Sequence, residues 1–215
     1  IVEKRRPQDG HFSISFGGIT SDRETWALVE SLAGTYGEDW WYLSLLAFIR
    51  QEQERWSEAE ALSARALAAE PASGHAVHAR THVFYETGEH KAGLEWLDGW
   101  IGDWGDTSDG KVHFTWHAAL HELMLGDDEA VRRRYVRDLA PPAVRGSRAL
   151  VDSASLLWRC EMTRNWDGRA GAAAVLDASP QDWLTQPQTS FAAMHAAIAL
   201  AAAKDGERLE ALRMF

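Results

Sequence analysis

Cysteine is almost absent from this chain, since Cys160 is the only one in 215 residues. A single thiol can form neither an internal disulfide nor a thiolate metal cage, so both are excluded within the chain. We therefore expect a reducing, cytoplasmic setting. Cys160 lies in an apolar run with Leu156, Leu157 and Trp158, and we interpret it as a packed core thiol rather than a nucleophile.

Long apolar runs are also lacking. The longest apolar-rich stretch runs from Phe191 to Ala203, contains His195, and is shorter than the roughly 20 residues that a membrane span needs. No charged leader followed by apolar residues opens the chain, so we expect no signal peptide and no membrane partner. The chain does not begin with Met, and we treat a fragment of a longer chain as one alternative.

Positive charge is scarce, because 22 Lys and Arg face 32 Asp and Glu, for a formal net charge of −10. Proteins that bind nucleic acid usually present a basic face. The one basic cluster, Arg132 to Arg134 with Arg137, is offset by the acidic residues 127–129 and by Asp138. We interpret this cluster as a solvated helix face, and we expect no nucleic-acid partner.

What is present favours helices. Residues 1–20 are expected to be irregular, because the strand-like alternation from Phe12 to Phe16 ends at once at Gly17. Ser21 and Glu24 have the spacing of a capping box, which marks the start of a helix. Glycine and proline then separate amphipathic stretches that we predict to be helical at 22–35, 39–53, 57–69, 75–87, 91–101, 111–125, 127–138, 147–163, 168–176, 189–204 and 207–214.

Three stretches share one layout, in which a turn ends one helix and small residues follow at matching offsets in the next. They start at Arg55, Gly88 and Gly126, and a fourth copy is suggested at 205–211. This pattern is typical of tetratricopeptide repeats of about 34 residues, in which small side chains let paired helices approach closely. We predict an all-α, tetratricopeptide-like array of antiparallel helix pairs, roughly 10–11 helices in all, over residues 21–215.

Histidine is arranged in pairs. His78 and His82 are four residues apart, as are His113 and His117, and His117 and His121. Residues with this spacing lie on one face of a helix, one turn apart. The first helices of tetratricopeptide repeats line the concave groove, and this register places His78, His82 and His113 near the groove, with His117 about one position off.

Two imidazole pairs on adjacent helices can form a divalent metal site. Zinc takes imidazole nitrogen at 2.0–2.1 Å, and imidazole also suits iron, copper and nickel. We expect the ligands to be His78, His82, His113 and His117, with zinc or iron as the metal. Two alternatives stay open: acid–base catalysis without metal, and a hydrogen-bonded polar core. The H-E-x-x-H motif of metalloproteases is absent, since residues 118–120 are Ala-Ala-Leu.

Two further polar residues lie in apolar segments. Asp152 is one helical turn before Ser155 within the segment 150–158, and a buried carboxylate there needs a partner. Histidine is the natural partner, because a carboxylate orients the ring and raises its basicity. The alternative is that Asp152 caps the start of a helix. His195 lies in a very apolar helix, either as a core histidine or as a further member of the histidine group.

These motifs together resemble the tetratricopeptide repeat protein 38 family. The resemblance covers roughly residues 40 to 205 and rests on two H-x-x-x-H pairs followed by Leu150-Val-Asp-Ser-Ala-Ser-Leu-Leu-Trp158. It implies a compact helical repeat array and adds no activity. It places six residues at the positions of the family's histidine and aspartate motif, namely His78, His82, His113, His117, Asp152 and His195. His75, His90 and His121 are outside that pattern.

Three hypotheses of function follow. The first is a protein, either an enzyme or a binding protein, that holds a small molecule or metal in a histidine-rich pocket; its chemistry as an enzyme would be hydrolytic or metal-assisted. The second is an interaction module that binds a peptide in the groove. The third is a structural protein with core histidines. Peptide clamps for carboxylate tails use Lys, Arg and Asn, whereas the stripe here carries His and Trp with Arg80 to one side, which favours the first hypothesis.

Overall fold

The computed structural model describes residues 23–107, 110–163, 166 and 169–215, and within this part every regular element is a helix. The chain divides into two compact units, Ile1–Gly110 and Lys111–Phe215, and each is described by itself. The strand-like stretch at Phe12 and the capping residue Ser21 lie outside the described residues. No helix that the structure describes is long and apolar enough to span a membrane.

The first unit contains the helices that the sequence predicts between residues 22 and 101, with the first of them split in two. Asp39 caps one of these helices by accepting a hydrogen bond from the backbone amide of Trp41 at 3.0 Å, and Ser73 caps another through Ala76. Gly88 ends a helix with φ of +78°, a conformation that glycine adopts without strain. The helices are α2 (Arg23–Ser31), α3 (Ala33–Tyr36), α4 (Trp40–Glu52), α5 (Trp56–Ala69), α6 (Gly74–Glu86) and α7 (His90–Trp104), followed by the short 3-10 turn η2 (Gly105–Thr107).

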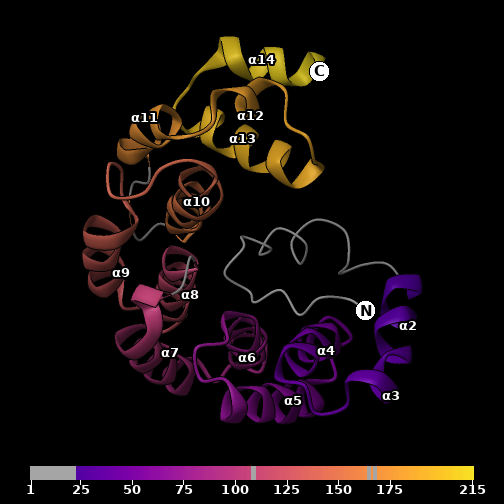
Figure 1. The fold of residues 1–215 in the computed structure, drawn as a ribbon. Coiled ribbons are helices and arrows are strands. Elements are labelled where there is room, and N and C mark those ends of the chain that lie inside the picture. Colours follow the sequence, from indigo (N-terminus) through magenta and orange to yellow (C-terminus); the bar gives the residue numbers. More distant parts are fainter. Residues whose placement is uncertain (1–22, 108–109, 164–165, 167–168) are drawn as a thin grey trace. The chain divides into compact units, whose positions relative to one another are not determined.

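Small residues bring α4, α5 and α6 side by side (Figure 1). Ala59 and Ala66 on α5 are fully buried, as the repeat pattern predicts for positions where paired helices touch. Ala66 packs with Leu43 of α4 and Ala76 of α6 in one core cluster. A larger side chain at Ala66 would therefore separate three helices at once.

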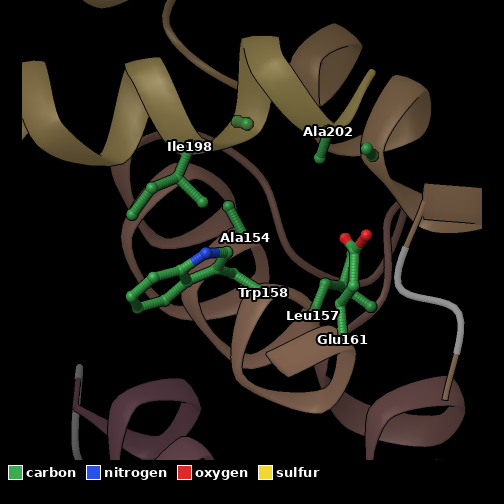
Figure 2. A pocket seen from close by; sticks show the side chains of 8 residues that line it. Ala154, Leu157, Trp158, Glu161, Ile198 and Ala202 are labelled. Carbon is green, nitrogen blue, oxygen red and sulfur yellow. The ribbon is translucent and has the colours of Figure 1, made fainter. Parts of the chain in front are cut away.

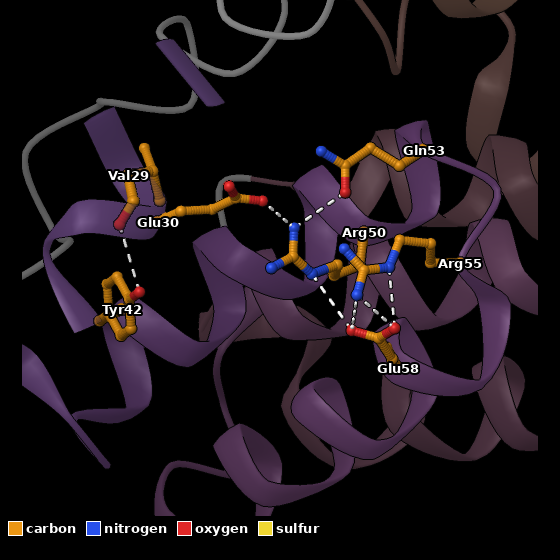
Figure 3. Close-up of polar contacts among 7 residues, drawn as sticks. All are labelled: Val29, Glu30, Tyr42, Arg50, Gln53, Arg55 and Glu58. Atoms are coloured by element: carbon orange, nitrogen blue, oxygen red, sulfur yellow. Dashed lines mark hydrogen bonds and ion pairs between the residues drawn. The ribbon is translucent and has the colours of Figure 1, made fainter. Parts of the chain in front are cut away.

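Arg50 links three helices of this unit (Figure 3). From α4, its guanidinium hydrogen-bonds Glu30 of α2 and approaches Glu58 of α5 at 3.3 Å. The Tyr42 hydroxyl adds a second link, donating to the carbonyl of Val29 at 3.2 Å. Polar contacts thus hold α2 against the α4–α5 pair.

The second unit also follows the predicted helices, with one addition. The short helix α12, which starts directly after Pro180, was not predicted, because five residues are too few to show a periodicity. Thr189 caps α13 through the amide of Ala192, and Asp205 caps α14 through that of Arg208. The elements are α8 (Lys111–Met124), α9 (Asp128–Arg134), η3 (Tyr135–Leu139), η4 (Ala149–Ser153), α10 (Ala154–Met162), α11 (Arg169–Ala178), α12 (Gln181–Thr185), α13 (Ser190–Ala202) and α14 (Gly206–Met214).

Two π-helical turns, η3 and η4, distinguish this unit. η3 continues α9, and η4 leads into α10. The hydroxyl of Ser153 in η4 donates to the carbonyl of Leu139 in η3 at 2.6 Å, so each turn holds the other in place. A π turn inserts one residue and rotates the side chains that follow, which is why such turns often occur at functional sites.

Candidate histidine and carboxylate site

His78 and His82 form a pair within the first unit. Their Nε2 atoms lie 3.0 Å apart on α6, one helical turn from each other. Phe48 of α4 packs against both rings, with centroid distances of 5.1 Å to His78 and 5.8 Å to His82. His78 is buried and His82 is half-buried, so the ring of His82 is the more accessible of the two.

His113 and His117 form the corresponding pair in the second unit. Their Nε2 atoms lie 3.1 Å apart on α8, and the two rings are nearly perpendicular at 80°. Both side chains are buried. The spacing of four residues predicts that one imidazole lies one turn above the next, and the two pairs share this edge-to-face geometry.

Asp152 extends the second pair into a chain. Its Oδ1 lies 2.9 Å from Nδ1 of His113, and its Oδ2 lies 3.3 Å from a guanidinium nitrogen of Arg148. The carboxylate is fully buried. The sequence predicts a histidine partner for Asp152, and His113 is that partner. The alternative that Asp152 is an N-cap is wrong, because it lies inside η4, whose N-cap position is Arg148.

This contact fixes the proton on His113. An ionised carboxylate only accepts hydrogen bonds, so Nδ1 of His113 carries the hydrogen and donates it to Asp152. Nε2 of His113 is then left with a lone pair directed at His117. The result is an ordered chain, Arg148–Asp152–His113–His117, in which each group contacts the next.

The π turn η4 carries the carboxylate of this chain. Ser153, the next residue after Asp152, is anchored to Leu139, so the backbone at Asp152 is tied to η3 as well as to its own helix. Both Asp152 and Ser153 are fully buried. A π turn in a buried position therefore directs the one charged side chain of this segment toward α8, where His113 lies.

His195 approaches the same region from α13. Its Nδ1 donates to the carbonyl of Phe191 at 2.8 Å, which leaves a lone pair on Nε2. Burial lowers the pKa of His195, while the negative charge of Asp152 acts to raise this pKa and the positive charge of Arg159 acts to lower it. His195 is thus within electrostatic reach of both residues, and the lowered pKa favours its neutral form.

Three residues of this region were missed by the sequence interpretation. Trp116 stacks on His113 with ring centroids 5.3 Å apart. The guanidinium of Arg159 lies over the ring of Trp116. Arg148 forms an ion pair with Asp152. Arg148 could have been found, because a basic residue four positions before an acidic one is a recognisable ion-pair spacing. Trp116 is three residues after His113 and so shares its helix face, but nothing in the sequence indicates the stacking.

The remaining histidines lie elsewhere in the two units. His121 is fully buried on α8, one turn beyond His117. In the first unit, burial lowers the pKa of His75, and His90 packs edge-on against Tyr85 at 5.3 Å. Of the residues that the sequence singles out, the second unit brings together His113, His117, Asp152 and His195, and the first unit brings together His78 and His82.

The geometry of the second pair suits two kinds of chemistry. Two nitrogens at about 2.05 Å from one tetrahedral zinc lie about 3.4 Å apart, close to the 3.1 Å observed between His113 and His117. The same distance also suits a hydrogen bond in which Nε2–H of His117 donates to Nε2 of His113. The carboxylate behind His113 supports either arrangement. No family model matches the sequence.

Proposed function

We propose that this chain is a histidine-based metal-binding protein in which His113 and His117 supply imidazole ligands and Asp152 orients them. The observation that carries this proposal is the buried chain Asp152–His113–His117, with distances of 2.9 Å and 3.1 Å. Imidazoles whose other nitrogen donates to a carboxylate are the usual ligands of zinc and related divalent metals. Zinc and iron are among the metals that this donor set fits.

Asp152 and Trp116 would hold the ring of His113 in a state suited to metal binding even without metal. Asp152 keeps Nδ1 of His113 protonated, so Nε2 is available as a ligand without a change of tautomer. Trp116 packs flat on His113 and restricts the rotation of its ring. With metal bound, positions not filled by protein would hold water, whose pKa zinc lowers toward 7, the basis of metal-assisted hydrolysis.

The pair His78 and His82 in the first unit supports metal binding at a second place in this chain. His78 and His82 repeat the geometry of His113 and His117 within 0.1 Å in their Nε2 separation, at 3.0 Å and 3.1 Å. We therefore propose metal binding by both pairs. The single unpaired thiol of Cys160 is consistent with a reducing, cytoplasmic setting for such a protein.

We also propose that the helices are arranged as tetratricopeptide-like pairs, in keeping with the resemblance to the tetratricopeptide repeat protein 38 family. Two features support this. Ala59 and Ala66 are fully buried where α5 packs on its neighbours, and Gly88 and Gly126 end α6 and α8 with positive φ at the matching turns. A ligand in the groove of such an array would be a small molecule or a peptide.

Elemental analysis tests the metal proposal. Protein purified without an affinity metal column is expected to carry about one equivalent of a divalent metal per binding pair. His117→Ala and His82→Ala should each lower the metal content while helix content by circular dichroism stays unchanged. His90→Ala, a half-buried histidine outside both pairs, is the control. No metal in the wild-type protein would contradict the proposal.

Metal-free acid–base catalysis is the second candidate. It is favoured by the hydrogen-bond distance between His113 and His117, because a proton could move along the chain from His117 toward the Asp152-supported ring. In that case the protein would contain no metal, and modification of His117 would abolish turnover of a substrate rather than metal binding.

A further inference from the structure

Arg80 on α6 is a half-buried cation without a carboxylate partner. Its Nε is buried and has no hydrogen-bond partner, and no ion pair or hydrogen bond joins its guanidinium to any described residue. Arg50 is the only other half-buried arginine among the described residues of the first unit, and it contacts the carboxylates of both Glu30 and Glu58. Buried polar groups are nearly always hydrogen-bonded in native proteins, so Arg80 calls for an explanation.

The sequence of α6 places no acidic residue where it could pair with Arg80. On a helix, the neighbours of a residue lie three or four positions away. For Arg80 these positions are Ala76, Val77, Val83 and Phe84. The histidine pair, at positions 78 and 82, is two residues away on either side, and residues at that spacing do not face each other. Arg80 therefore points away from the candidate metal ligands of this unit.

Two aromatic rings flank the guanidinium of Arg80. Its central carbon, Cζ, lies 4.9 Å from the ring centroid of Trp96 on α7 and 5.6 Å from that of Phe84 on α6. The centroids of the two rings are themselves 5.6 Å apart. The three side chains therefore meet at one place, and all three are half-buried. Contact with the faces of aromatic rings orients a guanidinium without using its N–H donors, which stay available for an acceptor.

Space is open beside Trp96. Gly99, three positions further along α7, is exposed, and a Cβ added there would meet no atom within 4 Å. Residues three apart are neighbours on a helix surface. Because this neighbour has no side chain, it leaves room beside the indole ring for an apolar group from outside the chain.

The small pocket of the second unit is a less suitable place for an anion (Figure 2). Apolar side chains line it between α10 and α13, among them Leu157 and Ala202, together with the carboxylate of Glu161. Like charges repel, so Glu161 disfavours a second negative charge there. An anion is better accommodated at Arg80, where the charge is positive and has no carboxylate partner among the described residues.

We propose that Arg80, Phe84 and Trp96 form a binding site for a carboxylate that is attached to an aromatic group, in a free organic acid or at the end of a peptide. The guanidinium presents N–H donors in a planar fork that matches a carboxylate, and the two rings offer apolar surface to the attached group. One guanidinium balances the single charge of a carboxylate, whereas a phosphate monoester carries about −1.5 to −2 charges at pH 7. The site does not require bound metal.

Calorimetric titration of the full chain tests the site. Benzoate is the probe for a free acid, and a short peptide with phenylalanine and a free carboxylate at its end is the probe for a peptide. Saturable binding of one ligand per chain is expected, and the tighter of the two probes assigns the source. Benzamide, which has a neutral amide in place of the carboxylate, should bind at least about tenfold more weakly than benzoate. The indole ¹H–¹⁵N resonance of Trp96, identified with Trp96→Phe, should shift on binding.

Variants decide whether the carboxylate occupies this place. Arg80→Gln should weaken benzoate binding about tenfold or more, because it removes charged donors to an anion. Arg80→Lys keeps the charge without the fork and should give an intermediate affinity. Trp96→Ala should weaken binding about two- to fivefold, because it removes a ring that orients the guanidinium. Arg23→Gln is the matched control, since Arg23 is an exposed arginine on α2 of the same unit, and this variant should bind as wild type.

The proposal is overturned if neither probe binds, if benzamide binds as tightly as benzoate, or if phenyl phosphate binds more tightly than benzoate. It is also overturned if no variant at Arg80 or Trp96 that is folded by circular dichroism binds benzoate more weakly than wild type. Its failure is distinguishable from failure of the metal proposal, because Arg80→Gln should leave the metal content unchanged.

Discussion

Asp152 is the residue on which the candidate site depends most. It is fully buried, and its two oxygens engage His113 on α8 and Arg148 one turn earlier on its own segment. A buried carboxylate is tolerated only with such partners, since its desolvation is not otherwise compensated. Its negative charge also determines which nitrogen of His113 is protonated, and so it connects the stability of the fold with the chemistry of the site.

Replacing Asp152 by Asn tests this connection. The amide oxygen can still accept a hydrogen bond from His113, so the free energy of unfolding should fall by only about 1–3 kcal/mol. Metal affinity should fall about 10- to 100-fold, because the ligand loses its anionic support. Chemical denaturation and a chelator competition measure the two effects. Asp182→Asn, at an exposed position on α12, is the control and should change neither.

At the level of single residues, part of the candidate site could be predicted from the sequence. The histidine pairs and the need of Asp152 for a partner follow from spacing and from the cost of burying charge. The choice of His113 as that partner, 39 positions away, depends on how η4 packs against α8 and is not encoded in any local pattern. The stacking of Trp116 and Arg159 was missed for the same reason.

Helix elements were more predictable, because their signals are local. Capping residues and turn glycines placed the ends of α4 to α10, α13 and α14 within a few residues of those observed. The π turns η3 and η4 were not predicted. The one residue that a π turn inserts changes the spacing of apolar residues too little to be recognised in the sequence. The missed turn η4 carries Asp152, so the least predictable element is part of the candidate site.

Two glycines within helices provide a test of packing between elements. Gly99 on α7 is exposed, and a Cβ added there would meet no atom within 4 Å. Gly171 on α11 is different, because a Cβ would lie 2.7 Å from the hydroxyl of Tyr135 and 2.9 Å from Cδ1 of Leu157. Tyr135 is buried in η3, so the phenol has little room to move.

Alanine at these positions should therefore have opposite effects. Gly99→Ala should raise the free energy of unfolding by about 0.5–1 kcal/mol, because alanine favours the helix and meets no clash. Gly171→Ala should lower it by about 1–3 kcal/mol through overpacking against Tyr135. Urea denaturation of both variants measures the difference. Equal effects would mean that α11 does not pack closely on η3 and α10.

At the scale of the whole molecule, the chain is two compact helical units, each with its own pair of histidines one helical turn apart. The all-helical class could be predicted from the glycine and proline breaks and the spacing of apolar residues. The tetratricopeptide-like pairing of helices stays a prediction, supported by small residues at α5 and by turn glycines. Function was the least predictable property, because it depends on contacts among side chains from different helices.

We propose that His117 is a metal ligand, and a competition titration of zinc against a chromophoric chelator measures its contribution. His121 provides the matched comparison, since it is also a buried histidine on α8, one turn away and outside the chain to Asp152. We expect His117→Ala to lower zinc affinity at least about 100-fold, while His121→Ala should stay within a few-fold of wild type. Equal affinities for the two folded variants would contradict it.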